Sequence, residues 1–366
     1  MANRSRSSVI HLVCGLYAAI FVVALGVSGA ILAFHDELDR ALNPKLSYVV
    51  PTGAQKPLAQ LEDAVKQKYP GYEVQGVQLP TSADLSTLII IGHADPRSGM
   101  AVAIDQYTGV VLGDSDHANN FADHVREFHS DLMWRGPGSA ILWFSAVGCF
   151  ALSITGVILW SRRKRLAPSS PGSPTFSLDL HSALGIYTAA FVFLYAITAI
   201  RPVPAGLVVP KDFFRPPHFN IVAAENAQPM SLEQLLDVAK KALPGAVPIF
   251  ISSDPKRPTF VAMRYPEDHS ERPKSGVLLD PYSGAVLHKV DLRSLNALQK
   301  FGWAWNMEIH TGAIFGTPSK IVAAATSLVI PLLGVTGPVI WWRRRRSKME
   351  AGPVNSKSAG GILVSQ

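Results

Sequence analysis

Four long runs of apolar residues dominate this 366-residue chain. None of the runs contains Asp, Glu, Lys or Arg, and each is close to or above the roughly 20 residues that a helix needs to cross a bilayer. They cover residues 9–34, 139–160, 182–200 and 321–342. Only 17% of all residues are charged, against roughly 25% in ordinary soluble domains. The sequence therefore predicts an integral membrane α-helical protein with four transmembrane helices.

Basic residues gather directly after two of these runs. Residues 162–165 follow the second run and residues 343–346 follow the fourth. Lys and Arg near the ends of spanning helices accumulate on the cytoplasmic side, so the net charge of +7 is better explained by membrane orientation than by nucleic-acid binding. We expect a multi-pass protein of the bacterial inner membrane with both termini in the cytoplasm. Residues 1–8, 161–181 and 343–366 would then be cytoplasmic, and residues 35–138 and 201–320 periplasmic.

The two polar segments have matching patterns. Each begins with helical spacing that stops at Pro-Gly, over residues 57–69 and 231–243. Strand-like runs follow in both segments, and each set leads into a Tyr-Thr-Gly or Tyr-Ser-Gly turn, where glycine supplies positive φ. The expected strands are 73–79, 86–92, 100–105, 247–252, 258–264 and 276–280. We expect two small periplasmic α+β domains, one from each segment.

The apolar runs also repeat. His11 opens a His-x-x-x-Gly-Leu-Tyr motif, and His181 opens the equivalent His-x-x-x-Gly-Ile-Tyr motif. The sequence Glu-x-His recurs at His129 and His310, and Thr-Gly followed by Trp closes the second and fourth runs. The chain is therefore interpreted as a tandem duplication of helix, outer domain and helix, with both copies in the same orientation.

Four histidines take part in this repeat and are the candidate cofactor ligands. If the copies pack about a two-fold axis along the membrane normal, His11 faces His181 near the cytoplasmic side. His129 then faces His310 at the outer ends of the second and fourth helices. Neutral imidazole binds haem iron well, and paired histidines from two helices hold haem b in helical bundles. We predict two haem b groups per chain; the alternative is that these are interfacial side chains.

Other residues remain open as alternatives. His35 and His124 could act as ligands in place of the four repeated histidines, and Met133 and Met307 are weaker candidates. Arg135 and Arg201 could pair with haem propionates or lie at the membrane interface. Trp303 and Trp305 could line an outer substrate surface, and Cys14 and Cys149 are expected to be packing residues. The other histidines, expected at the surface, are His93, His117, His218, His269 and His288.

The repeated motifs resemble the PepSY-associated transmembrane family. The resemblance rests on the His-x-x-x-Gly openings, the Glu-x-His motifs and the Thr-Gly-x-x-x-Trp ends, and it covers about residues 8–346. The Asp-x-Tyr-Thr/Ser-Gly segments resemble PepSY domains. Within the family, the chain is most similar to ferric-siderophore (ferrioxamine) reductases of the inner membrane. That resemblance implies two haems and reduction of iron(III) to iron(II) in the periplasm.

Several functions are compatible with these observations. The first is a haem-dependent ferric-siderophore reductase that takes electrons from a quinol or a cytoplasmic reductase. The second is a sensor or scaffold whose PepSY-like domains bind a peptide or protease. The third is a siderophore permease without redox activity, although the helices lack the buried charges that coupled transporters usually carry. No catalytic residue is assigned from the sequence.

Overall fold

This computed structural model describes residues 5–92, 99–115, 120–200, 219, 221, 227–269 and 274–350. Arg201, His93, His117 and His218 lie outside the described residues. The chain divides into two compact units. The helical unit comprises residues 1–27, 144–196 and 326–366, and the sheet unit comprises residues 28–143 and 197–325.

Four long apolar helices are present where the hydropathy predicts them. Each is long and apolar enough to cross a membrane, so the prediction of a multi-pass membrane protein is confirmed. They are α1 (Arg6–Leu32), α6 (Pro137–Arg163), α7 (Phe176–Ile200) and α13 (Thr317–Glu350). The helices extend beyond the apolar runs, so His181, which we assigned to the edge of a cytoplasmic loop, lies inside α7.

Small residues allow α1 and α13 to pack closely in the helical unit. A Cβ atom added to Gly26 of α1 would lie only 2.6 Å from the backbone oxygen of Ser327 and 2.6 Å from Cδ of Pro331. A Cβ on Gly334 of α13 would lie 2.9 Å from the Val22 side chain. Glycine at a helix interface lets two backbones approach closely. In lipid, where the hydrophobic effect does not drive helix association, the van der Waals contacts of such close packing stabilise the helix pair.

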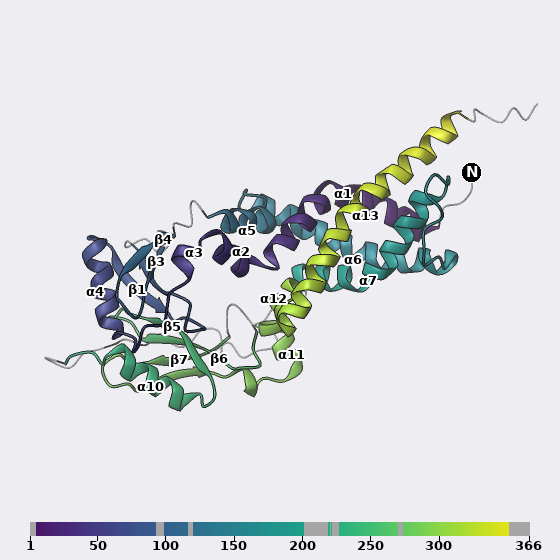
Figure 1. Cartoon of the computed structure of the whole chain (residues 1–366). Helices are drawn as coiled ribbons and strands as arrows, with labels where there is room; N and C mark the ends of the chain where they lie inside the picture. Colours follow the sequence, from purple (N-terminus) through teal and green to yellow (C-terminus); the bar gives the residue numbers. More distant parts are fainter. Residues whose placement is uncertain are drawn as a thin grey trace, which may run out of the picture. The chain divides into compact units, whose positions relative to one another are not determined.

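The sheet unit contains one antiparallel sheet of eight strands in the order β4-β3-β2-β1-β5-β6-β7-β8. Figure 1 shows strands of the first half, such as β1, beside strands of the second half, such as β5. The strands of the first half are β1 (Glu73–Gln78), β2 (Thr87–Gly92), β3 (Met100–Ile104) and β4 (Val111–Ser115). Those of the second half are β5 (Val247–Ser252), β6 (Thr259–Arg264), β7 (Ser275–Leu279) and β8 (Val286–Val290). All six strands named from the sequence are confirmed. The sequence analysis expected one α+β domain from each segment, and in the structure the pairing of β1 with β5 joins both sets of strands into one sheet.

The β1–β5 seam has the register of a two-fold axis. Val77 pairs with Ile251, Gly76 pairs with Ser252, and Gln78 pairs with Phe250. Val77 and Ile251 are each the fifth residue of their strand. On either side of this pair, the fourth residue of one strand pairs with the sixth residue of the other. This reciprocal pairing is the isologous arrangement of a symmetric interface. It is compatible with the interpretation of two copies in parallel orientation.

Two amphipathic helices share a hydrophobic core with this sheet. They are α4 (Leu58–Lys68) and α10 (Leu232–Ala242), both within the ranges expected from the sequence. Leu61 of α4 and Leu235 of α10 are fully buried in the core, together with strand residues such as Ile251. The turns after β3 and β7 contain Gly109 and Gly284 at φ +74° and +69°, as the Tyr-Thr/Ser-Gly pattern predicts.

Short helices connect the sheet to the long helices of the chain. The first half contains α2 (His35–Leu42), α3 (Pro44–Ser47) and α5 (Phe121–Asp131). The second half contains α11 (Ala297–Lys300), a π-helical turn at Phe301–Trp305 and α12 (Asn306–Thr311). These helices were not predicted from the sequence, because polar segments of this length do not stand out in the hydropathy pattern. Two of them, α5 and α12, carry the repeated histidines His129 and His310, and α2 begins at the alternative candidate His35.

Candidate cofactor-binding histidine pairs

The first histidine pair lies in the helical unit. His11 is in the second turn of α1 and His181 is in the second turn of α7. Their imidazole centroids are 6.3 Å apart, and the ring planes are perpendicular at 90°. The two residues are 170 positions apart in the chain (181 − 11), yet they face each other as the repeat predicts.

The second pair lies in the sheet unit. His129 and His310 have ring centroids 6.2 Å apart at an interplanar angle of 67°. Our expectation that they form the outer ends of the second and fourth long helices needs correction. They lie instead on α5 and α12, which end in left-handed residues, Leu132 and Gly312, before the long helices begin. Burial lowers the pKa of His129, which favours the neutral imidazole that binds metals.

Each of the four histidines hydrogen-bonds a hydroxyl group through Nδ1. In every case the hydroxyl lies on a helix other than the one that carries the histidine. The contacts are His11 to Thr155 at 3.0 Å, His181 to Thr336 at 2.8 Å, His129 to Ser28 at 2.8 Å and His310 to Thr198 at 2.9 Å. A partner on Nδ1 fixes the ring orientation and leaves Nε2 as the nitrogen available to a metal, as in known histidine-ligated sites.

The hydroxyl geometry also assigns the tautomer in the helical unit. Thr155 donates its proton to the backbone oxygen of Ala151 at 2.7 Å, and Thr336 donates to that of Leu332 at 2.7 Å. Because each hydroxyl has only one proton, its oxygen must accept the hydrogen bond from the imidazole. Nδ1 therefore carries the ring proton in both histidines, and Nε2 keeps its lone pair.

Glycine makes room for both rings of the helical unit. A Cβ at Gly156 would lie 3.4 Å from Cε1 of His11, and a Cβ at Gly337 would lie 3.5 Å from Cε1 of His181. These glycines follow Thr155 and Thr336 directly. The repeated Thr-Gly dipeptide thus supplies the hydrogen-bond acceptor and the space beside the imidazole in both halves.

The four hydroxyl residues were missed by the sequence analysis, although a signal existed. Thr155 and Thr336 are part of the motif that we used only to recognise the repeat. Ser28 and Thr198 each lie 17 residues after the histidine that opens their helix (28 − 11 and 198 − 181). A polar residue at the same place in two charge-free runs is the pattern that could have identified them.

The alternative ligands have other surroundings. His35 is the first residue of α2, and its Nδ1 lies 3.1 Å from the Asp36 carboxylate. This hydrogen bond holds the pKa of Asp36 below its usual value. His124 is exposed on α5, and Met133 is exposed just beyond that helix.

The remaining candidates have partners or surface positions of their own. Met307 is exposed on α12. The guanidinium of Arg135 lies 3.5 Å from the Glu127 carboxylate, and the ammonium of Lys274 lies over the Trp303 ring at 5.4 Å from its centroid. Cys14 and Cys149 are free thiols.

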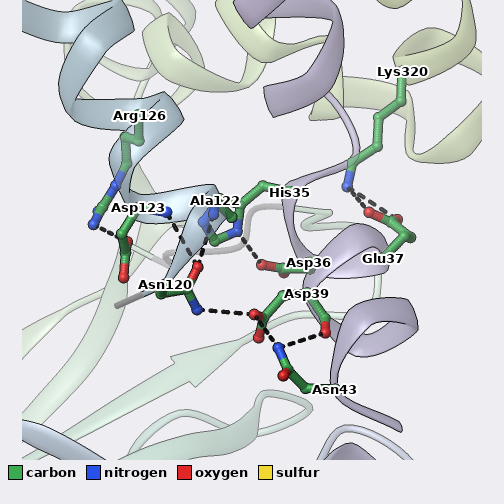
Figure 2. A network of polar contacts seen from close by, with 10 residues as sticks. All are labelled: His35, Asp36, Glu37, Asp39, Asn43, Asn120, Ala122, Asp123, Arg126 and Lys320. Atoms are coloured by element: carbon green, nitrogen blue, oxygen red, sulfur yellow. Dashed lines mark hydrogen bonds and ion pairs between the residues drawn. The ribbon is translucent and has the colours of Figure 1, made fainter. Parts of the chain in front are cut away.

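A polar network positions α5 against α2 (Figure 2). The Asn120 side chain accepts hydrogen bonds from the backbone amides of Ala122 and Asp123, which caps the N-terminus of α5. Its amide group donates to the Asp39 carboxylate of α2 at 2.9 Å. The cap therefore ties the helix that carries His129 to a neighbouring helix, and we regard Asn120 as part of the site's support.

Among the described residues, no cluster of three or more His, Cys, Asp or Glu side chains could hold a bare metal ion.

Comparison with protein families shows that residues 8–344 match the PepSY-associated TM region. No protein with a curated description matches the chain.

Proposed function

Because the chain belongs to the PepSY-associated transmembrane family, we propose that it is a di-haem reductase of ferric siderophores. In this proposal the protein lies in the bacterial inner membrane as a tandem duplication, with its sheet unit in the periplasm. Electrons enter near His11 and His181 and leave near His129 and His310. The ferric complex is reduced at the periplasmic side, and the iron is released as iron(II) for uptake.

The spacing of the histidine pairs is the observation that carries this proposal. Two imidazoles that bind one metal from opposite sides have centroids roughly 6 Å apart, because each metal–nitrogen bond is about 2.0 Å and each ring adds about 1 Å. The two pairs have centroid separations of 6.3 and 6.2 Å. The two pairs would therefore fit an iron-containing group that is held by two imidazoles.

Haem is such a group, and when bound it supplies a one-electron carrier whose potential depends on the axial ligands and their hydrogen bonds. The chain's own residues perform the binding and the tuning. His11, His181, His129 and His310 would hold the iron through Nε2. The hydroxyls of Thr155, Thr336, Ser28 and Thr198 would orient the rings, and those of Thr155 and Thr336 would raise ligand basicity by accepting from Nδ1.

The electron balance of the proposed reaction is simple. Each iron(III) takes up one electron and becomes iron(II), with no bond formed to the protein. A quinol oxidised to quinone gives two electrons and releases two protons, so one quinol would reduce two ferric ions. The resulting iron(II) is held more weakly by the oxygen ligands of a siderophore, because these hard ligands favour the more highly charged ion.

Haem content is the first test. A pyridine haemochrome assay on the purified full-length chain should find haem b at two groups per chain. His129→Ala should remove one of them, because the facing His310 loses its counterpart across the iron. His124→Ala, an exposed histidine on the same helix, is the matched control and should retain both. Two haems in both variants, or none in the wild type, would reject the assignment.

Activity is tested separately. The reduced protein should reoxidise when ferric siderophore is added, and a ferrous-iron chelator should trap one iron(II) per electron. A permease would instead move a siderophore loaded with redox-inert gallium across the membrane of proteoliposomes. A sensor or scaffold would do neither. Gallium transport without iron reduction would therefore overturn the reductase proposal.

A further inference from the structure

The sheet unit contains a second feature that could serve the proposed reaction, a pocket of about 420 Å³. Its volume lies in the range of small-molecule sites, roughly 300–1,000 Å³. Apolar walls come from Val247, Pro248 and Ile249 at the start of β5 and from Pro80. The polar side chains at the pocket are Glu37, Arg264, Asp268, His269 and Lys320. An apolar cavity with several converging polar groups is the usual form of a ligand site.

An ion pair between a buried lysine and a partly exposed glutamate lines this pocket. Lys320 of α13 is only 7% exposed, and its ammonium lies 3.2 and 3.3 Å from the two carboxylate oxygens of Glu37 on α2. Figure 2 shows the two side chains pointing toward each other from separate helices. Burying an ammonium group costs desolvation, and the exposed part of the Glu37 carboxylate stays open to solvent. A buried cation beside a cavity is therefore a candidate for ligand contact.

The lining of the pocket also includes an arginine available to a ligand. Arg264 is half-buried at the end of β6, and within the described part of the chain no hydrogen bond or ion pair joins its guanidinium to another side chain. The adjacent Tyr265 is 3% exposed, and Arg293 stacks on its ring at 3.7 Å from the centroid. This stacking, with the Arg293–Glu267 ion pair at 2.7 Å, makes the wall rigid.

The pocket is joined to the outer histidine pair by a short stretch of chain. Gly316 and Thr317 line the pocket, and Gly316 follows His310 by six residues (316 − 310). Six residues span no more than about 22 Å even when fully extended, and this stretch contains a helical turn at Ala313–Phe315 that shortens it. A ligand in the pocket would therefore lie close to the group that His129 and His310 are proposed to hold.

We propose that this pocket is the docking site of the electron acceptor, an oxygen-ligated ferric chelate of low net charge. The proposal rests on the proposed function, since it gives that reaction its substrate site. Arg264, His269 and Lys320 can donate hydrogen bonds to the oxygens that surround the iron. Glu37 and Asp268 bring the local charge close to balance, which favours a nearly neutral chelate over a highly anionic one.

Binding of a redox-inert analogue tests the docking site independently of electron transfer. Titration of the purified full-length protein with gallium(III)–desferrioxamine B gives a dissociation constant for the wild type. Arg264→Ala should weaken this binding roughly ten- to hundredfold, the range for loss of a charged hydrogen bond. Arg257→Ala removes an exposed arginine from the turn before β6 and should change the dissociation constant less than about twofold. Thr81→Trp should block the pocket without removing a charge.

The outcomes separate the two proposals. Weaker gallium binding in both pocket variants, with unchanged haem content, supports the docking site. Wild-type affinity in both variants, or no gallium binding by the wild type, overturns it. If the pocket variants lose gallium binding but the wild type does not reduce the ferric complex, the site stands and the reductase proposal fails. A gallium tris-catecholate that binds more tightly than the hydroxamate complex would contradict the charge argument.

Discussion

Each candidate histidine hydrogen-bonds a hydroxyl that orients its ring. Each hydroxyl lies on a helix other than the one that carries the histidine. The orientation of each ring therefore depends on the packing of two helices against each other. Because Nδ1 is engaged by the hydroxyl, rotation of the ring by half a turn about its bond to Cβ would break the hydrogen bond. The pairs are therefore preorganised before any cofactor binds.

Removal of one hydroxyl tests this preorganisation. In Thr155→Val the shape of the side chain is kept, but His11 loses its acceptor. We expect haem affinity at that site to fall about 10- to 100-fold, the usual effect of losing a residue that orients a metal ligand, and the midpoint potential of one haem to change. Potentiometric titration and haem content measure both effects.

The matched control is Thr188→Val. Thr188 is buried in α7 and donates only to the Leu184 backbone oxygen of its own helix. It should leave both haems and both potentials unchanged. Equal behaviour of the two variants would show that the Thr155 contact is incidental.

Sequence could predict which histidines face each other but not their immediate surroundings. A histidine within an apolar run is conspicuous, and its repetition 170 residues later makes it more so. Threonine and serine are common in membrane helices, where they hydrogen-bond their own backbone, so Thr155 and Ser28 carry no signal by themselves. Their roles depend on which helices become neighbours, and that information is not local.

At the level of elements, α5 depends on its N-terminal cap. Asn120→Ala removes the acceptor for two backbone amides and the link to Asp39, and should cost about 1 kcal/mol of stability. Because α5 carries His129, we also expect loosened binding of the outer haem, measured as faster haem loss to apomyoglobin.

A cap elsewhere in the sheet unit provides the comparison. Ser231 caps α10 through a capping box with Gln234, and α10 carries none of the candidate histidines. Ser231→Ala should lower the unfolding midpoint by a similar amount while haem loss stays at the wild-type rate. Equal haem loss in both variants would refute the specific role of α5.

The crossing of α1 and α13 gives a second prediction at this scale. In Gly26→Ala the new methyl group would meet backbone and proline atoms at 2.6 Å, so the helices must separate, at a cost of about 1–3 kcal/mol. Gly148→Ala on α6 is the control, since nothing lies within 4 Å of the added atom. Thermal unfolding in detergent should show a lower midpoint for the first variant alone.

Elements with strong periodicity were predictable, and short polar ones were not. The ranges of α4 and α10 and of the strands follow from hydrophobic spacing and from glycine turns. The helices α5 and α12 were not predicted. α12 has only six residues, and its helical state depends on packing, whereas α5 has eleven residues, as many as α4 and α10, so its length does not explain why it was missed. Hence both outer histidines were assigned to the ends of long helices rather than to separate short ones.

At the scale of the whole molecule, a buried carboxylate makes stability depend on pH. Burial of Glu62 raises the pKa of its carboxyl above the ordinary value of 4.5, and the hydrogen bond from Ser253 opposes that rise only in part. The folded state therefore keeps the proton at a pH where the unfolded state has lost it. Stability is unaffected below about pH 4 and falls as the pH rises from there through the raised pKa.

Glu62→Gln should abolish this dependence. The amide can still accept from Ser253 but carries no charge, so we expect the variant to be more stable than the wild type at about pH 7 and similar near about pH 4. Unfolding midpoints at the two pH values measure the difference. Asp63→Asn, an exposed neighbour on α4, should show no such gain; an equal gain in both would indicate a general charge effect.

The joining of both halves in one sheet could not be read from the sequence. Every strand is locally specified, but the β1–β5 contact involves three residue pairs between segments 174 positions apart (251 − 77). Nothing in the pattern of either strand distinguishes an edge strand from an internal one. Whether the strands form two sheets or one therefore depends on long-range strand pairing alone.

The reciprocal register of that seam has a consequence for how such a chain could arise. A polypeptide of half this length would expose β1 as an edge, and a second copy could pair with it in the same register to complete the eight-stranded sheet. Each histidine pair also takes one residue from each half, so a lone half would hold no complete pair. If the chain arose by duplication, an ancestral homodimer would have contained both histidine pairs. Fusion of the two genes would then have made the pairing of the halves independent of protein concentration.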